Sequence, residues 1–397
     1  MQFRYLAFIV SLCGLLQPST AADIYVGPNG SDNGDGSITS PLASIQAAVD
    51  AATAGTVIYL RGGTYAPTSN IQITAVSGRA DAPITIASYE GEKVIIDGEN
   101  LPGTPAELDA SLPNGDRGIF HIENVDYWRF IDLELINGPY GIYARDASNN
   151  YYERLITRDN YESGFQLQGA SSNNVVLYLD SYGNRDPRKN GESADGFACK
   201  EGSGEGNILR GARLWNNVDD GLDLWEFKSA VTIEDTLAWG NGFNRWDFDD
   251  FQGDGNGFKL GGGDASDIGP ANHIIRNCIA FSNAAKGFTD NKQPGNFLLS
   301  HNTAWDNAHV GFQITTAAAT LERNVAVANN NGGEQVSLKS GTVEEGNSWN
   351  ESGAGGVSFE STDVSLVQGE REESGKIVAS GFLLPVDGAD IGATTHW

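Results

Sequence analysis

A short motif that recurs along the chain constrains the fold more than any other feature. It consists of a small polar or charged residue, a glycine and a large apolar residue, as in Asp195-Gly196-Phe197 and Asn256-Gly257-Phe258. Successive motif glycines are 23, 23, 32, 25, 36, 30 and 24 residues apart, which indicates a base period near 23 with insertions. Periods of this length are typical of solenoid proteins. The motif glycines are Gly118, Gly141, Gly164, Gly196, Gly221, Gly257, Gly287 and Gly311.

A second marker keeps the same register, because an asparagine stands four residues before several motif glycines. Short alternating runs such as Val231–Glu234 lie between the markers and predict strands. A unit of this length with several short strands cannot bury an apolar face alone, whereas stacked coils can. We therefore expect an all-β parallel β-helix with an internal asparagine ladder at a turn. A leucine-rich horseshoe lacks its Leu-x-x-Leu-x-Leu signature here, and a propeller needs longer, more even blades. The marker asparagines are Asn137, Asn160, Asn217, Asn283 and Asn307.

The chain is expected to form one domain over residues 23–397. Residues 41–54 predict an amphipathic helix and residues 56–60 a strand, within an N-terminal cap over about 23–65. The coils are expected over about 66–345. Residues from about 346 to 397 lose the repeat, and we expect them to close the other end of the solenoid.

Residues 1–22 have the pattern of a secretory signal peptide. Arg4 precedes an apolar stretch over residues 6–16, and small residues follow at 20–22. This stretch is too short to span a bilayer. We expect a secreted, extracellular protein without a membrane anchor.

Composition adds three expectations. The net charge of -27 argues against nucleic acid as a partner. The mature chain keeps Cys199 and Cys278, too few for a disulfide framework. Asn29 and Asn350 begin acceptor triplets for N-glycosylation if the host is a eukaryote. We expect a monomer.

Counting from the motif glycines places polar residues on one outer face. The residue after each glycine is apolar and should point inward, so the residue two after it should point outward. This outward column predicts that Asp223 and Lys259 stack on successive coils. Three more carboxylates, Asp195, Asp219 and Asp220, lie just before the glycines of neighbouring coils. The whole predicted column is Gln166, Ala198, Asp223, Lys259 and Thr289.

Four aspartates in one patch repel one another unless a cation lies between them. Oxygen ligands in an irregular arrangement favour Ca²⁺, and no histidine or cysteine joins the cluster to favour zinc. The plainer interpretation is an Asx-type turn at a coil corner. Stacking on adjacent coils favours a Ca²⁺ site formed by Asp195, Asp219, Asp220 and Asp223.

Lys259 is the candidate general base. A lysine on a strand face is usually only solvated, but a neighbouring cation lowers the lysine pKa and favours the neutral amine. Lys286, Lys200 and Trp225 are candidates for binding a substrate carboxylate and stacking on a sugar ring; the alternative is solubilising charge and a tryptophan beneath a loop.

Two insertions, at residues 185–189 and 245–251, are expected to form loops along the sides of the same face. The second begins with Arg245, a further candidate for substrate binding. The acidic residues of this region hold a second ion or form an ordinary acidic surface loop, and the loop is the favoured interpretation. They are Asp247, Asp249, Asp250 and Asp254.

Three segments carry a resemblance to a known family. Residues 195–198 (Asp-Gly-Phe-Ala), residues 215–225 (Trp-Asn-Asn-Val-Asp-Asp-Gly-Leu-Asp-Leu-Trp) and residues 255–262 (Gly-Asn-Gly-Phe-Lys-Leu-Gly-Gly) resemble the core motifs of polysaccharide lyase family nine. The resemblance implies a secreted right-handed parallel β-helix and a Ca²⁺-dependent pectate lyase. It also implies that the four aspartates are the calcium ligands and that Lys259 is the Brønsted base.

The predicted activity is β-elimination on a pectic polysaccharide, polygalacturonate. One alternative is a lyase acting on another pectic polymer such as rhamnogalacturonan. Another is a polygalacturonase-like glycoside hydrolase, which would use paired carboxylates and water. A non-catalytic carbohydrate-binding solenoid is the third. An ultraviolet-absorbing unsaturated product distinguishes a lyase from the last two.

Overall fold

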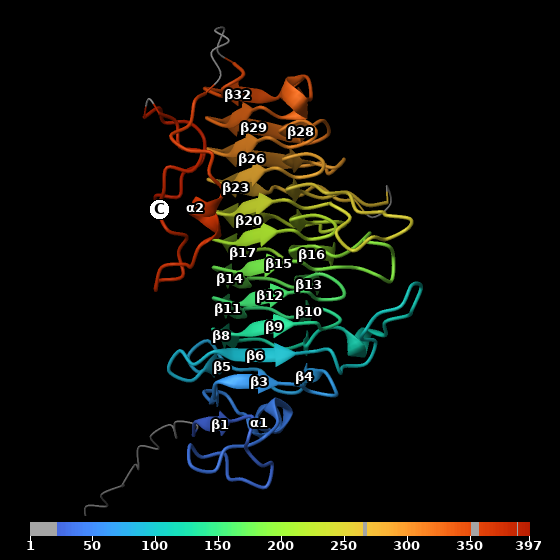
Figure 1. Ribbon diagram of the computed structural model, residues 1–397, viewed down its shortest axis with the longest axis vertical. Helices are drawn as coiled ribbons and strands as arrows, with labels where there is room; N and C mark the ends of the chain where they lie inside the picture. Colours follow the sequence, from blue (N-terminus) through green and yellow to red (C-terminus); the bar gives the residue numbers. More distant parts are fainter. Residues whose placement is uncertain (1–21, 265–267, 351–356, 387) are drawn as a thin grey trace, which may run out of the picture.

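The computed structural model describes residues 22–264, 268–350, 357–386 and 388–397. The predicted signal peptide lies outside the described residues except for Ala22. The chain winds into stacked coils, and three parallel sheets run the length of the column (Figure 1). Strands of consecutive coils pair in parallel throughout each sheet, as the repeat predicts.

The first sheet has 12 strands and begins in the N-terminal cap. Its strands are β1 (Ile24–Val26), β2 (Val57–Leu60), β5 (Ile84–Ser88), β8 (Trp128–Ile131), β11 (Tyr151–Glu153), β14 (Val175–Leu177), β17 (Asn207–Arg210), β20 (Val231–Glu234), β23 (Ile274–Arg276), β26 (Asn296–Ser300), β29 (Ala318–Glu322) and β32 (Val343–Glu345).

The second sheet has 10 strands and carries the motif phenylalanines. Its strands are β4 (Ile71–Ile73), β7 (Phe120–Glu123), β10 (Ile142–Arg145), β13 (Phe165–Gly169), β16 (Phe197–Gly202), β19 (Leu222–Asp223), β22 (Phe258–Lys259), β25 (Phe288–Thr289), β28 (Phe312–Ile314) and β31 (Val336–Leu338).

The third sheet also has 10 strands. They are β3 (Gly63–Tyr65), β6 (Val94–Asp97), β9 (Glu134–Ile136), β12 (Ile156–Arg158), β15 (Asp180–Tyr182), β18 (Arg213–Trp215), β21 (Leu237–Trp239), β24 (Ile279–Phe281), β27 (Thr303–Trp305) and β30 (Val325–Val327). Two single 3₁₀ turns, Asn114–Asp116 and Asn330–Gly332, interrupt the connections.

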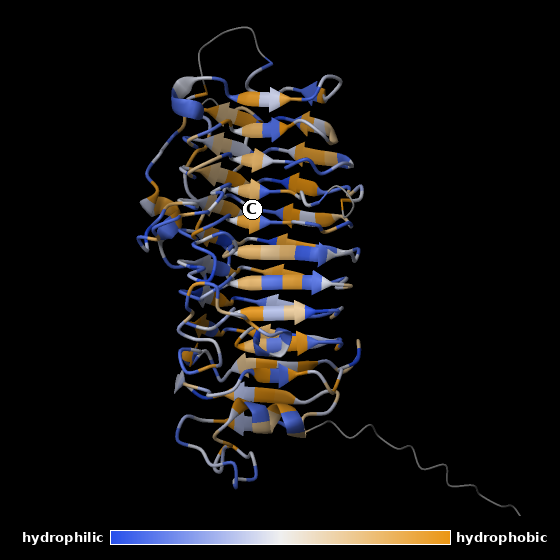
Figure 2. Cartoon of the chain, turned by 90° about the vertical axis from the view of Figure 1, so that its right-hand side faces the viewer, coloured by the Kyte–Doolittle hydropathy of each residue, from blue (hydrophilic) through white to orange (hydrophobic). Residues whose placement is uncertain are grey.

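Apolar and polar residues alternate along the strands, so each coil contributes an inward row to the core (Figure 2). The residues after the motif glycines are fully buried and stack on one another. The ring centroids of Phe258 and Phe288 are 4.7 Å apart, and those of Phe288 and Phe312 are 4.8 Å apart. This spacing is the ordinary distance between paired strands.

An asparagine ladder lies inside the turn between the third and second sheets. After the first member, each side chain accepts hydrogen bonds from the backbone N–H and the amide of the asparagine one coil earlier, as Asn241 does from Asn217. The predicted ladder is therefore present, with Asn137 as its one error. Gly138 occupies the ladder position, because the turn from this position to the motif glycine Gly141 is one residue shorter than in the next coil. Asn137 donates a hydrogen bond to Asp97 instead. The ladder consists of Asn160, Asn184, Asn217, Asn241, Asn283, Asn307 and Asn329.

A short helix lies at the N-terminal end of the column. Helix α1 (Ile45–Ala51) begins after Ser44, whose side chain accepts a hydrogen bond from the N–H of Ala47. Ile45, Ala48 and Val49 are buried against the first coils. The helix is shorter than the predicted 41–54, because the segment before Ser44 is irregular.

The C-terminal segment corrects a prediction. Residues 351–356 and 387 of the predicted closing segment lie outside the described residues. Residues 357–386 and 388–397 do not close the end of the solenoid; they run back along its side, and α2 (Ser365–Gln368) lies there (Figure 1). The cause is a stack of aromatic rings on the outer face of the third sheet, where Trp215 and Trp239 lie 5.0 Å apart. Val367 and Phe382 pack on this stack and remove it from water.

Candidate active site on the second sheet

The candidate site lies on the outer face of β16, β19 and β22. The backbone register pairs Ala198 with Asp223, and Asp223 with Lys259. The predicted outward column is therefore the observed one. Asp195, Asp219 and Asp220 precede β16 and β19 in the turns that contain the motif glycines.

These turns bring the four predicted aspartates together. Each contributes a carboxylate oxygen to a group whose members all lie within 4.8 Å of one another, and all four residues are buried. Residues separated by up to 28 positions in the sequence thus form one cluster, because successive coils stack closely.

Hydrogen bonds hold part of the cluster in place. Asp220 Oδ1 accepts from the backbone N–H of Asn256 at 2.6 Å and from its side-chain amide at 2.8 Å. Asp219 Oδ1 accepts from the N–H of Asp254 at 2.6 Å. Asp219 Oδ2 is buried and has no hydrogen-bond partner in the described part of the chain. A buried, unpartnered carboxylate oxygen in a cluster whose possible ligands are all carboxylates fits a hard cation such as Ca²⁺.

Two lysines enter the cluster from neighbouring strands. Lys200 Nζ is 2.7 Å from Asp195 Oδ2 and 2.8 Å from Asp223 Oδ2. Lys259 Nζ is 3.2 Å from Asp220 Oδ2 and 3.4 Å from Asp223 Oδ2. Lys200, which the sequence suggested for substrate binding, therefore contacts the aspartate cluster itself.

Burial and mutual repulsion perturb the carboxylates. Burial raises the pKa of Asp195 to about 7 and that of Asp220 to about 6. Burial and the neighbouring Asp220 raise the pKa of Asp219 well above its ordinary value. Burial also opposes ionisation of Asp223, but Lys200 and Lys259 outweigh it and lower the pKa of Asp223.

The pKa of Lys259 is also displaced. Burial disfavours its charged form, but Asp223 and Asp220 outweigh burial and raise the pKa well above the ordinary value. This direction is opposite to the lowering expected from a neighbouring cation, because the protein groups around Lys259 are mainly carboxylates.

A groove of about 790 Å³ passes over the site. Its lining includes Lys200, Asp223 and Lys259, together with Trp225, whose ring centroid is 5.4 Å from Lys259 Nζ. Residues 188–193 and 252–254 contribute to its walls, so the loops near both predicted insertions border the site. A groove of this kind is accessible to an extended polymer.

Two predicted substrate-binding residues lie elsewhere. Arg245 is exposed and donates to Asn216 Oδ1 at 2.8 Å, away from the groove lining. Lys286 lies one coil beyond Asn256 and is also absent from the lining. The structure gives neither residue a place beside Lys259.

Sequence reasoning missed one contact of the candidate base. Asp254 Oδ2 accepts a hydrogen bond from Lys259 Nζ at 2.9 Å. Asp254 belongs to the acidic segment considered for a second ion, and the remaining acidic side chains of that segment are exposed. Its position in an insertion removes it from any column counted from the glycines, so no sequence signal located it.

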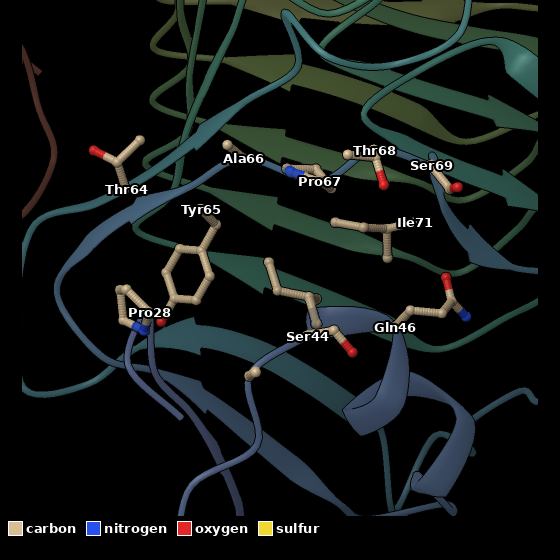
Figure 3. Close-up of a pocket in the computed structure, with 12 residues that line it drawn as sticks. Pro28, Ser44, Gln46, Thr64, Tyr65, Ala66, Pro67, Thr68, Ser69 and Ile71 are labelled. Atoms are coloured by element: carbon tan, nitrogen blue, oxygen red, sulfur yellow. The ribbon is translucent and has the colours of Figure 1, made fainter. Parts of the chain in front are cut away.

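A second cavity of about 380 Å³ lies between α1 and the chain after β3 (Figure 3). Tyr65, Gln46 and Ile71 are among its lining residues, and none of those residues is an acid, a lysine or a histidine. The cavity therefore offers no carboxylate, amine or imidazole for acid–base chemistry, and the groove over Lys259 is the candidate active site.

The comparisons with known proteins identify the family. The profile described as Pel9A-like, right handed beta helix region, matches residues 24–345. The chain belongs to this family. It is 71% identical to "Pectate lyase PEL9" of Emericella nidulans, over 95% of each chain. It is 34% identical to "Pectate lyase L" of Dickeya chrysanthemi, over 90% of this chain and 82% of that one.

Solved structures agree with the family assignment. The crystal structure of pectate lyase Pel9A matches with a TM-score of 0.77 and 31% identity, covering 94% of this chain and 91% of the other. A rhamnogalacturonan lyase matches with a TM-score of 0.79 at 24% identity, covering 92% and 97%, which shows the shared fold alone. The right-handed parallel β-helix, the resemblance to family nine and the enzyme class of polysaccharide lyase are confirmed. Among the described residues, no helix has the length and apolarity to cross a membrane.

Proposed function

We propose that this lyase is a secreted, Ca²⁺-dependent pectate lyase that cleaves polygalacturonate by β-elimination, with Lys259 as the Brønsted base. One observation carries the proposal: Lys259 Nζ lies beside Asp220 and Asp223 on the outer face of successive coils, in a groove accessible to a polymer. The relatives named as pectate lyases support the choice of substrate.

Asp195, Asp219, Asp220 and Asp223 would hold the ion. When bound there, Ca²⁺ would supply positive charge beside the C6 carboxylate of the substrate and oppose the raised pKa of Lys259. The protein groups position the reaction around it: Asp220 and Asp223 keep Lys259 Nζ directed into the groove, and Trp225 offers a ring for a sugar to pack on.

The reaction needs a proton acceptor at C5 of the uronate. Neutral Lys259 Nζ takes the C5 proton, the electrons of that bond form the C4–C5 double bond, and the bond from C4 to the glycosidic oxygen breaks. The departing oxygen receives a proton from solvent. Asp220 and Asp223 stabilise the resulting Lys259 ammonium until it loses the proton.

The rate is expected to rise with pH in the alkaline range. Only the neutral amine accepts a proton, and the carboxylates around Lys259 keep its pKa high. The neutral fraction therefore grows as the pH approaches the lysine pKa from below.

A substrate panel tests the reaction and the polymer together. Purified protein with Ca²⁺ is given homogalacturonan, methylated pectin or rhamnogalacturonan in oxygen-18 water, and products are followed by ultraviolet absorbance and mass spectrometry. We expect unsaturated products without incorporated oxygen-18, fastest from homogalacturonan. Saturated products carrying oxygen-18 would identify a hydrolase, and fastest release from rhamnogalacturonan would overturn the proposed substrate.

Secretion and a monomeric state belong to the same proposal. N-terminal sequencing of protein from culture medium should give Asp23 as the first residue, and light scattering should give the mass of one chain. Retention inside the cell with an intact Met1 would contradict secretion.

A further inference from the structure

We propose that Lys200 is a built-in counter-ion that competes with Ca²⁺ for Asp195 and Asp223 and so weakens Ca²⁺ binding. The inference rests on the proposed function, because it places the ion among the same four carboxylates. It assigns Lys200 a role that differs from substrate binding and from proton transfer.

The geometry sets Lys200 apart from an ordinary surface lysine. Its Nζ bridges Oδ2 of Asp195 at 2.7 Å and Oδ2 of Asp223 at 2.8 Å, and its side chain is 12% exposed. Both partners are buried and belong to the four-carboxylate cluster. Charge-assisted contacts of this length are strong, so an entering cation must weaken or replace them.

In the rest of the cluster, two buried carboxylate oxygens, Asp219 Oδ2 and Asp220 Oδ2, have no hydrogen-bond partner in the described part of the chain. Lys259 Nζ lies 3.2 Å from Asp220 Oδ2 and 3.4 Å from Asp223 Oδ2. An ion that binds through Asp219 must share the remaining carboxylates with two ammonium groups. Among the described residues, the ion pairs of Lys200 are all with the carboxylate cluster, whereas Lys259 also contacts Asp254 outside it.

Lys200 acts in opposite directions on the protein and on the ion. Its positive charge offsets the repulsion among four buried carboxylates and so stabilises the fold. The same charge repels a cation bound among them. Lys200 also lines the groove, so its side chain has space to turn away from Asp195 when the ion enters. The competition favours weak Ca²⁺ binding, in the range of about 10⁻⁴–10⁻³ M that extracellular calcium modules show.

Calorimetric titration with Ca²⁺ and thermal unfolding in excess chelator test the proposal. The proteins are wild type, Lys200→Met and Lys189→Met. Lys189 is the matched control because it also lines the groove, but its Nζ contacts Ser193 Oγ and no member of the cluster. We expect Lys200→Met to bind Ca²⁺ at least ~10-fold more tightly, since it loses a competing cation, and to unfold several degrees lower in chelator. Lys189→Met should match wild type in both.

Equal or weaker Ca²⁺ binding by folded Lys200→Met would overturn the proposal, because Lys200 would then only support the ligands. If Lys200→Met folds only with Ca²⁺, titrating a chelator into the Ca²⁺-loaded variant measures the same affinity. Release of Ca²⁺ from the variant at the chelator concentration that releases it from wild type would overturn the proposal. Failure of wild type to bind Ca²⁺ at all would instead reject the metal assignment of the proposed function, and this inference with it.

Discussion

Lys259 is held by three carboxylates from two parts of the chain, and this determines what its removal should do. Asp220 and Asp223 come from one coil, and Asp254 comes from an insertion loop. The side chain is 7% exposed, so its position is defined by the protein and not by solvent. A base held in this way contributes to the reaction rate through its proton affinity as well as through its position.

Replacing Lys259 with alanine should lower the turnover of polygalacturonate by about 10²–10⁴-fold, the contribution typical of general acid–base catalysis. The fold should persist, as circular dichroism can verify. The exposed Lys292→Ala is the control and should retain the wild-type rate. Near-normal turnover in Lys259→Ala would remove Lys259 from the role of base.

Asp254 offers a test of the electrostatics around the base. Its carboxylate contributes to the raised pKa of Lys259 after the larger effects of Asp223, Asp220 and Asp219. Asp254→Asn removes one negative charge, so the pKa of Lys259 falls and the rise of rate with pH moves to lower pH. The pH–rate profile measures the shift, with exposed Asp250→Asn as the control. A shift to higher pH would contradict the assignment.

The site residues that lie on strands could be predicted from the sequence, whereas those in the insertion could not. Asp223 and Lys259 were located because strands have a period of two and the glycines mark each coil. Asp254 and Arg245 lie in an insertion without a repeat, so their distance from the site cannot be counted along the chain. The contact of Lys200 with Asp195 and Asp223 depends on a side-chain direction that spacing does not specify.

At the scale of elements, the asparagine ladder fixes the turn that positions the aspartates. Asn217 is buried, accepts from Asn184 and donates to Asn241. Asn217→Ala leaves those buried groups without partners and should lower the free energy of unfolding by about 1–3 kcal/mol. Urea unfolding measures the change, with exposed Asn33→Ala as the control. Equal stability of the two variants would show that the ladder contributes nothing.

The C-terminal segment is fastened to the column by a buried ion cluster. Asp180 contacts Arg213 on β18 and Arg371 in the C-terminal segment, each at 2.6 Å. Burial opposes ionisation of Asp180, but Arg371 and Arg213 outweigh it and lower its pKa. The carboxylate therefore contributes stability that is complete well above the ordinary value of 3.8 and is lost as the pH falls through its lowered pKa.

Asp180→Asn should lower the free energy of unfolding at pH 7 by about 3–5 kcal/mol, because it leaves two buried guanidinium groups without their carboxylate. The difference from wild type should shrink only below pH 3.8, where the Asp180 carboxyl of the unfolded chain takes up a proton before that of the folded protein does. Unfolding by urea at a series of pH values measures both effects. A difference that already disappears near pH 6 would contradict the lowered pKa.

Besides the shorter helix α1, two predictions at this scale were wrong for physical reasons. Asn137 stands four residues before a glycine like its counterparts, yet its turn is one residue shorter, and only the pairing of Gly138 with Asn160 reveals this. The C-terminal segment lacks the repeat, so its position depends on the ring stack of the third sheet, which it covers. The alternation along β18 and β21 predicts that Trp215 and Trp239 point outward, but the sequence does not show which segment covers these rings.

At the scale of the whole molecule, the net charge of -27 and a uronate polymer repel each other. Bulk attraction therefore cannot bring the proposed substrate to the groove, and recognition has to be local. The stacked coils provide this, because they concentrate lysines and the four-carboxylate cluster on one face of a negatively charged column. The repeat thus accounts for both the shape of the molecule and the place of its chemistry.

In the proposed function, this cluster must hold Ca²⁺ for Lys259 to carry out β-elimination. The initial rate of unsaturated product from polygalacturonate, measured before chelation, in excess chelator and after Ca²⁺ is restored, tests this requirement. We expect the rate to be lost in chelator and to recover with Ca²⁺. A rate that chelation leaves unchanged would show that the reaction does not need the ion.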